Sequence, residues 1–378
     1  MFYWLLYPLR EIHSLKIFSL TFEINLSFFR IFGYVTFRMV MAAITSLIIM
    51  YVIGPRFILF LQKIKFKESV RDDGPKSHSS KAGTPTMGGL LVMTSMSISI
   101  FLWGNLTNTY TVSVWICTLA LSLVGFRDDY SKSVLKIAGG MRPRIKMLFQ
   151  LLIGFSFALL IYNFPYFADN TPAMPTALYV PFFKDPVLIL GIFAIPFWVL
   201  VVTGTSNAVN LTDGLDGLAI GISTIVVGTL GVMAYISGVS SIANQLLLPF
   251  VPEANELTVF AAALTGAAIG FLWYNSHPAE VFMGDTGSLA IGGAIGMMAI
   301  CIKRELLLVI LGGVFVAEAL SVILQVVSFK TRGKRIFLMA PLHHHFEMKG
   351  WHENKVVIRF WIVGALLALI SISSLKIL

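Results

Sequence analysis

The chain has 378 residues, of which 57% are hydrophobic and only 12% are charged, and its formal net charge is +9. A soluble domain carries about twice that charged fraction, so the composition excludes a soluble globular protein. Several apolar runs reach the roughly 18–20 residues that cross a bilayer. We therefore predict an all-α polytopic membrane protein. We ascribe the excess of lysine and arginine to the positive-inside bias and expect no nucleic acid partner.

The first thirty residues are rich in aromatic side chains and are interrupted by charges. They lack the basic start, the apolar core and the small-residue cleavage site of a signal peptide. We interpret residues 1–38 as an interfacial N-terminal extension that leads into the first span, within a single integral membrane catalytic domain over 1–378. Cys117 and Cys301 lie in apolar runs and indicate small core residues, not a disulfide framework.

About ten transmembrane helices are predicted from the apolar runs. Their approximate ranges are 39–62, 86–104, 110–126, 145–164, 186–205, 218–237, 256–274, 286–302, 305–329 and 356–376.

Lysine and arginine gather in the connections after the first, third and ninth spans, whereas the alternate connections hold almost none. Lys303 and Arg304, between the eighth and ninth spans, break this pattern. The asymmetry predicts that the basic connections are cytoplasmic and that both termini lie outside. Every acidic or histidine-rich motif then falls on the cytoplasmic face, which indicates a cytoplasmic active-site cleft.

The first polar motif is "GFRDDYSKSVLK", which follows the third span. Adjacent aspartates at a helix end point in different directions, so Asp128 and Asp129 alone are often a solvated cap. Lys132 and Lys136 follow at helical spacing and predict a positive stripe beside the acidic end. That arrangement suits a cation next to a phosphate-bearing substrate.

The second motif, "NAVNLTDGLDGLA", lies between two apolar runs. Aspartate, asparagine and glycine also form simple turns. Here, however, four polar residues recur at a spacing of three, which predicts one polar face (Asn207, Asn210, Asp213 and Asp216). A carboxylate toward the bilayer interior costs about 2.5–3.5 kcal/mol, so such residues indicate function.

The third motif, "FMGDTGS", places Asp285 between glycines at the start of the eighth span, with Asn275 and His277 upstream. Glycines let backbone N–H groups approach an anion at a helix N-terminus. Alone, this motif is weak evidence for a functional site. Together with the other polar motifs, it supports one.

The fourth motif is "PLHHHFE", in the connection after the ninth span. Three adjacent histidines do not readily face one tetrahedral metal, and neither cysteine is near in the sequence, so zinc is not favoured. Contact of His343 and His344 with phosphate or with a metal-bound substrate is the better interpretation.

Convergence of these carboxylates requires a cation. Two carboxylates about 4 Å apart repel by about 4 kcal/mol at an effective dielectric near 20. The candidate ligands are hard oxygens, which favour Mg²⁺ over zinc. Mg²⁺ commonly bridges a few carboxylates to substrate phosphates, so the sequence indicates phosphoryl-type transfer at the membrane surface.

With these residues assembled, the chain resembles the phospho-N-acetylmuramoyl-pentapeptide-transferase family, within the polyprenyl-phosphate N-acetylhexosamine-1-phosphate transferases. The resemblance runs over nearly the whole chain, through "KAGTPTMGG", "RDDYSK", "NAVNLTDGLDGLA", "FMGDTGS" and "MAPLHHHFEMKGW". It implies a ten-helix bundle in the bacterial plasma membrane and a Mg²⁺-dependent reaction at its cytoplasmic face. The expected substrates are UDP-MurNAc-pentapeptide and undecaprenyl phosphate, and the products are lipid I and UMP.

The resemblance also implies roles for individual residues. Asp128 would be the base, with Asp129, Asp285 and His343 as further catalytic residues, and Asp285 would bind Mg²⁺; an older interpretation makes Asp285 a covalent nucleophile. The expected substrate-binding residues are Lys81, Lys132, Lys136, Asn210, Asp213, Asp216, Asn275, Phe282, Gln325 and His344. Lys81, Asn275 and Phe282 are expected near the uridine, where an aromatic ring can stack on a flat base.

Two other functions stay open. A sister transferase that uses UDP-GlcNAc would resemble this chain outside the "PLHHHFE" motif. A transporter of an anionic lipid or nucleotide would carry charges inside its spans, where Glu318 is the main exception here. The sequence leaves open a one-step or a two-step transfer and the oligomeric state, a homodimer included; bilayer lipids are expected partners.

Overall fold

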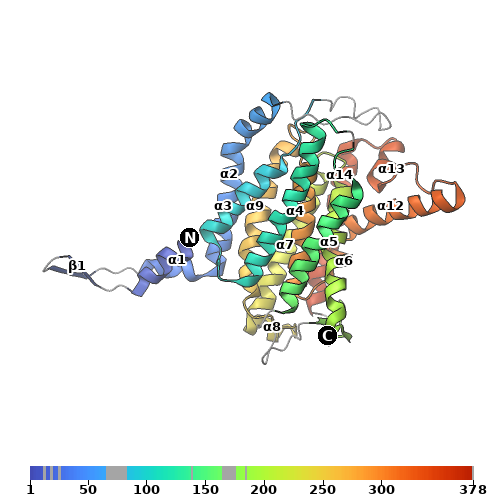
Figure 1. Cartoon of the computed structure of the whole chain (residues 1–378). Helices are drawn as coiled ribbons and strands as arrows, with labels where there is room; N and C mark the ends of the chain where they lie inside the picture. The colour runs from blue at the N-terminus through green and yellow to red at the C-terminus, as the bar shows by residue number, and fades with distance from the viewer. Residues whose placement is uncertain are drawn as a thin grey trace.

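The chain forms a bundle of long helices in a computed structural model, which describes residues 1–11, 14–17, 20–23, 27–64, 83–137, 139–163, 176–183 and 185–376 (Figure 1). Nine helices of the described part are long and apolar enough to cross a membrane, and Gly89–Trp103 is a shorter apolar helix. The predicted all-α polytopic fold is therefore confirmed. The shorter helix has 15 residues and rises about 22 Å, which is less than the roughly 30 Å of a hydrocarbon core.

The long helices are α2 (Val35–Lys63), α3 (Gly89–Trp103), α4 (Thr109–Ser133), α5 (Pro143–Tyr162), α6 (Ala194–Thr212), α7 (Leu218–Gly238), α9 (Leu257–Asn275), α10 (Gly284–Cys301), α12 (Gly313–Arg332) and α14 (Glu353–Ser373). The short elements are α1 (Phe2–Leu6), η1 (Tyr7–Glu11), β1 (Ser14–Ile17), β2 (Leu20–Glu23), η2 (Ser27–Gly33), β3 (Ala177–Leu178), β4 (Leu188–Ile189), η5 (Gly191–Phe193), α8 (Ser240–Gln245), η6 (Ala254–Glu256), α11 (Leu308–Leu311), α13 (Leu342–Met348) and η7 (Ser374–Lys376). Strands β1 and β2 pair antiparallel, as do β3 and β4.

Helix α10 lies at the centre of the bundle. It packs against α4, α6, α3 and α7, and every residue from Thr286 to Cys301 is buried. It is also the least apolar of the nine candidate spans. A helix surrounded by protein does not need an apolar surface toward lipid, so α10 can carry glycine, serine and threonine.

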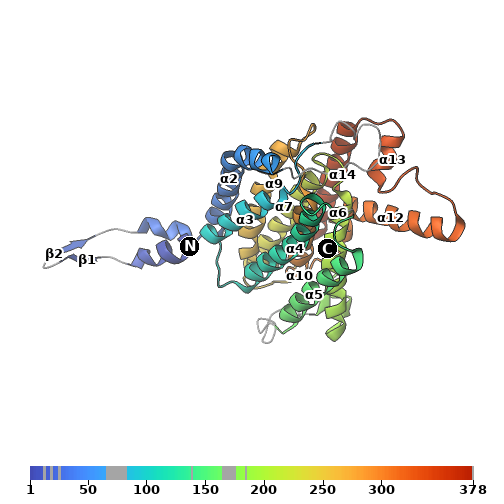
Figure 2. The ribbon, with the colours of Figure 1, turned by 45° about the horizontal axis from the view of Figure 1, so that its top comes forward.

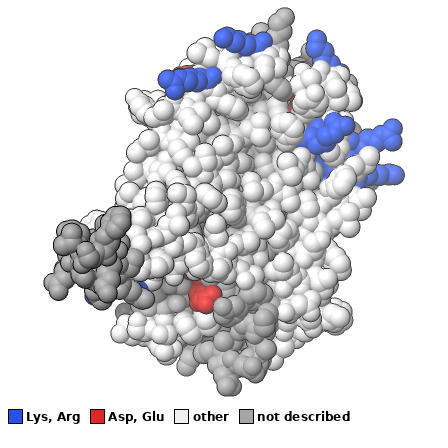
Figure 3. Space-filling view, turned by 60° about the vertical axis from the view of Figure 1, so that its left-hand side comes forward, with Lys and Arg blue, Asp and Glu red and all other residues white. Residues whose placement is uncertain are grey.

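The other long helices present large apolar side chains outward, among them Leu123 and Trp273, which are 69% and 71% exposed. Figure 3 shows a broad middle zone without charge, with lysine and arginine side chains gathered toward the upper end of that face. An exposed apolar girdle with charges at its end is expected of a surface that contacts lipid.

Two predicted spans are displaced or divided in the structure. The predicted span 186–205 is displaced, because β4 and η5 occupy part of it and α6 runs on to Thr212. The predicted span 305–329 is divided, because α11 ends at Leu311 and α12 begins at Gly313. Adjacent glycines, Gly312 and Gly313, weaken a helix at that point.

Both ends of the described chain lie at one end of the bundle. The N-terminal amine contacts the backbone of Phe101 and Leu102 near the end of α3, and η7 lies at the end of α14. The strands β1 and β2 project away from the bundle in both ribbon views (Figure 2). The N-terminal segment ends before α2 begins at Val35, so the predicted extension 1–38 is slightly too long, and its interfacial position stays a prediction.

The exception to the charge pattern has a local explanation. Lys303 is fully buried over the ring of Trp198, and Arg304 is 9% exposed. Glu305 lies beside them and accepts a hydrogen bond from the Trp198 indole at 3.0 Å. Burial lowers the pKa of Arg304 to about 10. These charged side chains are packed inside the bundle and contribute little charge to its exposed surface, so they do not count in the comparison of basic connections.

Candidate active site

The carboxylates of the first and third motifs meet where the last turns of α4 pass the first turn of α10. The two helices approach closely at Gly125, since a Cβ atom built there would lie 2.1 Å from the carbonyl oxygen of Asp285. Only glycine permits this contact. The close packing at Gly125 therefore brings Asp128, Asp129 and Asp285 together.

Asp129 caps the start of α10. Its carboxylate accepts hydrogen bonds from the Asp285 and Thr286 backbone N–H groups at 3.0 and 2.9 Å and from the Thr286 hydroxyl at 2.6 Å. An anion at this position satisfies free N–H groups and interacts favourably with the helix dipole. The side chain is almost fully buried. This geometry makes Asp129 a positioning residue for Asp285; its predicted catalytic role stays a prediction.

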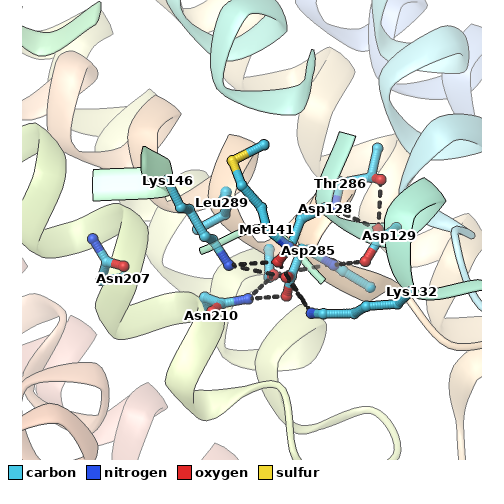
Figure 4. A network of polar contacts seen from close by, with 12 residues as sticks. Asp128, Asp129, Lys132, Met141, Lys146, Asn207, Asn210, Asp285, Thr286 and Leu289 are labelled. Carbon is cyan, nitrogen blue, oxygen red and sulfur yellow. Dashed lines mark hydrogen bonds and ion pairs between the residues drawn. The ribbon is translucent and has the colours of Figure 1, made fainter. Parts of the chain in front are cut away.

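Asp128 points the other way, toward two lysines that also contact Asp285 (Figure 4). The Lys132 ammonium lies 3.1 Å from Asp128 and 2.8 Å from Asp285. The Lys146 ammonium lies 3.2 and 2.9 Å from the same two carboxylates. Four charged groups from α4, α5 and α10 therefore form one compact network.

Asn210 completes this network from α6. Its amide donates to Asp285 Oδ1 at 2.6 Å and to the Ser288 hydroxyl at 2.9 Å. Asn207, one turn earlier, donates to Gln150 of α5 at 2.9 Å. Both asparagines lie on the helix, because α6 extends beyond its predicted end.

The predicted common polar face of the second motif is wrong. Helix α6 ends at Thr212, so Asp213 stands at its C-terminal cap and Asp216 lies in the following turn. Asp216 contacts a separate group of residues, in which His277 Nδ1 lies 3.0 Å from Asp216 and 3.4 Å from Glu353. The turn between α6 and α7 thus connects two polar groups.

The oxygens of Asp128 and Asp285 are the donors that fit Mg²⁺. Both carboxylates reach the same two ammonium groups, so their oxygens converge on one region. Hard carboxylate oxygens that converge in this way suit a small divalent cation. Asp216, His277 and Glu353 could also hold a metal by their spacing, since their ligand atoms lie within 4.8 Å of one another.

The histidine motif forms the short helix α13, within the connection that follows α12. His343 is fully buried, and its Nδ1 lies 3.1 Å from Glu318 of α12. His344 Nδ1 lies 2.7 Å from Glu347. His345 Nδ1 accepts a hydrogen bond from the Leu338 backbone N–H at 3.1 Å, which agrees with a pKa lowered by burial and by Lys349. The three rings therefore have three different environments.

His343 meets the turn between α6 and α7. A Cβ atom built on Gly214 would lie 2.3 Å from His343 Nε2. Within the described residues, this buried nitrogen has no hydrogen-bond partner. The turn therefore reaches the histidine motif as well as the carboxylates.

The remaining predicted substrate residues have varied positions. Asn275 is buried, accepts from the Gly217 N–H and donates to the Val281 carbonyl. Phe282 is half-buried and joins the segment near Pro85 through backbone hydrogen bonds. Gln325 accepts from the Ile336 and Phe337 N–H groups.

One predicted basic residue does not join the network. Lys136 follows the end of α4 with a positive φ of 52°, so the predicted helical stripe ends at Lys132. Lys81 lies outside the described residues. The substrate-binding roles of both stay predictions.

Sequence reasoning did not assign roles to Lys146, Glu318 and Glu353, although each has a charged or imidazole partner in the structure. Lys146 stands in a basic connection and Glu318 is the charge inside an apolar span. These two positions in the sequence could have indicated that Lys146 and Glu318 have functional roles. Glu353 carried none that distinguishes it from an ordinary helix-start glutamate.

Comparison with known proteins agrees with this arrangement. Residues 111–303 match glycosyl transferase family 4, and residues 81–91 match signature 1 of the phospho-N-acetylmuramoyl-pentapeptide-transferases. The chain is 53% identical to the phospho-N-acetylmuramoyl-pentapeptide-transferase of Leptospira biflexa serovar Patoc over 364 residues, covering 94% of this chain and 98% of the relative. It is 48% identical to the enzyme of that name from Geobacter sp. strain M21, covering 100% and 99%. Since this identity is found over alignments that cover nearly the whole chain, the chain belongs to the phospho-N-acetylmuramoyl-pentapeptide-transferase family.

Proposed function

We propose that the chain transfers phospho-MurNAc-pentapeptide from UDP-MurNAc-pentapeptide to undecaprenyl phosphate, giving lipid I and UMP. The observation that carries this proposal is the convergence of Asp128 and Asp285 with two lysines at one end of an apolar helix bundle. A lipid phosphate at the membrane surface and a nucleotide donor from the cytoplasm can both reach such a site. The site is proposed to face the cytoplasm of a bacterial plasma membrane.

Asp128 is proposed as the base. It would take a proton from the undecaprenyl phosphate, whose oxygen then attacks the phosphorus that bears the sugar. The bond from this phosphorus to the bridging oxygen breaks, and UMP leaves with that oxygen. Lys132 and Lys146 are placed to stabilise the negative charge on the phosphate oxygens as the bond breaks.

Asp285 is proposed to hold Mg²⁺, with Asp128 and Asn210 beside it. Mg²⁺, when bound, would neutralise the pyrophosphate of the donor. The two lysines also balance the charge of these carboxylates. A two-step route through a phosphorylated Asp285 is the alternative, and an adduct trapped with donor alone would favour it.

The test offers the purified protein undecaprenyl phosphate, Mg²⁺ and either UDP-MurNAc-pentapeptide or UDP-GlcNAc. We expect rapid UMP release from the first donor only, and loss of that release when EDTA removes Mg²⁺. Faster release from UDP-GlcNAc would instead identify a sister transferase. Undiminished turnover in EDTA would contradict the magnesium proposal.

A further inference from the structure

Glu318 is a charged residue within an apolar span, and the need for an apolar helix does not explain its presence there. It lies inside α12 and is fully buried, where an isolated carboxylate is costly. All hydrogen bonds that the described residues make with its carboxylate come from His343. The His343 backbone N–H lies 3.1 and 3.4 Å from the two oxygens, and the ring Nδ1 lies 3.1 Å from Oε2. Within the described residues, the Glu318 carboxylate therefore interacts with this one histidine.

The contacts constrain both the helix and the ring. Helix α13 has no side-chain cap of its own, and the Glu318 carboxylate accepts the N–H of its second residue instead. The same carboxylate can only accept, so the proton between it and Nδ1 belongs on the imidazole. Nδ1–H thus points into α12, and Nε2 points to the opposite side of the ring.

Nε2 is directed at the turn between α6 and α7. It is buried without a partner within the described residues, and it lies 2.3 Å from the position that a Cβ of Gly214 would take. Asp213 and Asp216 flank that glycine in the sequence, and Asn210 of the same motif contacts Asp285. An unpaired buried nitrogen is costly, and such groups are typical of functional sites.

We propose that Glu318 is a positioning residue for the transfer reaction: it fixes the Nδ1–H form and the orientation of His343, so that Nε2 is held against Gly214 in the turn that carries Asp213 and Asp216. The inference rests on the proposed function. The ammonium and carboxylate network around Asp128 does not include Glu318, so the two can fail separately.

The Glu318→Gln variant tests this directly. Glutamine keeps the shape of glutamate, and its carbonyl can still accept the His343 backbone N–H. Its amide NH₂ then faces Nδ1 and donates, which moves the imidazole proton to Nε2. We expect kcat to fall by about 10²–10⁴-fold, as when a histidine is held in the wrong tautomer. The KM of the UDP-sugar and the melting temperature should change little.

Two comparisons separate positioning from a structural role. Glu305→Gln alters another buried glutamate, at the far end of the bundle, and should retain the wild-type kcat. In a His343→Ala background, Glu318→Gln should cause no further loss, because it acts through the ring. An unchanged kcat in Glu318→Gln, or a full additional loss in the double variant, would overturn the inference.

A measurement without turnover keeps the two proposals distinguishable. Nitrogen-15 NMR of histidine-labelled protein, with His343→Ala to assign the signal, should show Nδ1 protonated in the wild type and unprotonated in Glu318→Gln. An unprotonated Nδ1 in the wild type would refute the positioning role even if UMP release is normal. Failure of the wild type to release UMP, with Nδ1 protonated, would count against the proposed function alone.

Discussion

At the scale of residues, two lysines hold two carboxylates in contact. Lys132 is 40% exposed along its side chain, whereas Lys146 is 16% exposed and is the better shielded partner. Coulomb interactions weaken with solvent screening, so Lys146 should contribute more to the pairing of Asp128 with Asp285. Lys146 lies in α5, which contains neither aspartate.

Lys146→Met removes this ammonium and keeps the length of the side chain. We expect kcat to fall by about 10²-fold, because a charge that stabilises the developing phosphate anion is lost. The measurement is UMP release by purified protein at saturating donor. Lys330→Met, which removes an exposed lysine from the end of α12, is the control and should behave as wild type. Equal kcat in both variants would exclude Lys146 from the reaction.

Asp128→Asn tests the proposed base. The amide cannot take the proton of the lipid phosphate, so we expect a loss of about 10²–10⁴-fold in rate. Binding of the nucleotide donor, measured by titration calorimetry, should be nearly retained. A variant that loses affinity in proportion to rate would make Asp128 a binding residue instead.

The sequence predicted that the acidic motifs lie on one face, because each motif follows a span that ends on the same predicted face. It could not predict their partners. Asp129 and Asp128 are neighbours in the chain, yet one caps α10 and the other contacts two lysines. Asp216 contacts His277 and Glu353, away from Asn210, because α6 ends between them. Such divisions depend on where a helix ends, which hydrophobic patterns leave uncertain by a few residues.

At the scale of elements, the approach of α4 to α10 sets the geometry of the site. The apolar runs predicted both helices, and α4 continues past its predicted end at 126 to Ser133. Hydropathy underestimated it because the extra turns are polar and buried against α10. The close approach at Gly125 is a property of packing that no pattern in one helix reveals.

Gly125→Ala should separate these helices. The new methyl group would overlap the Asp285 carbonyl, so we expect a destabilisation of about 1–3 kcal/mol and a large loss of activity as Asp285 shifts. Thermal unfolding and UMP release measure the two effects. Gly204→Ala is the matched control, since it lies in α6 with open space at its Cβ. Gly204→Ala should keep full activity and should not lower stability. Equal behaviour of the two variants would contradict the packing argument.

At the scale of the whole molecule, the four motifs occupy one end of the bundle and the described chain ends occupy the other. The sequence predicted this division from the alternation of basic connections. Its one exception, Lys303 with Arg304, is explained by burial. The side of the membrane on which the motifs lie stays a prediction.

Cysteine labelling tests that side. Lys334→Cys stands after α12 at the motif end, and Thr107→Cys stands between α3 and α4 at the other end; both positions are exposed. The native cysteines, Cys117 and Cys301, are buried and should give little background. In intact cells, an impermeant maleimide should label Thr107→Cys only, and Lys334→Cys should react after the membrane is opened. The reverse pattern would place the motifs outside.

The position of α10 has a consequence for biogenesis. This helix is the least apolar of the candidate spans and has the smallest contact with lipid, so its own partitioning into a bilayer is the weakest. During synthesis its neighbours α4 and α6 precede it, and they already offer the surface that it needs. Asp285 therefore enters the membrane on a segment retained there by earlier helices. A nascent chain whose α4 or α6 is impaired should lose integration of α10, and with it the proposed metal ligand Asp285.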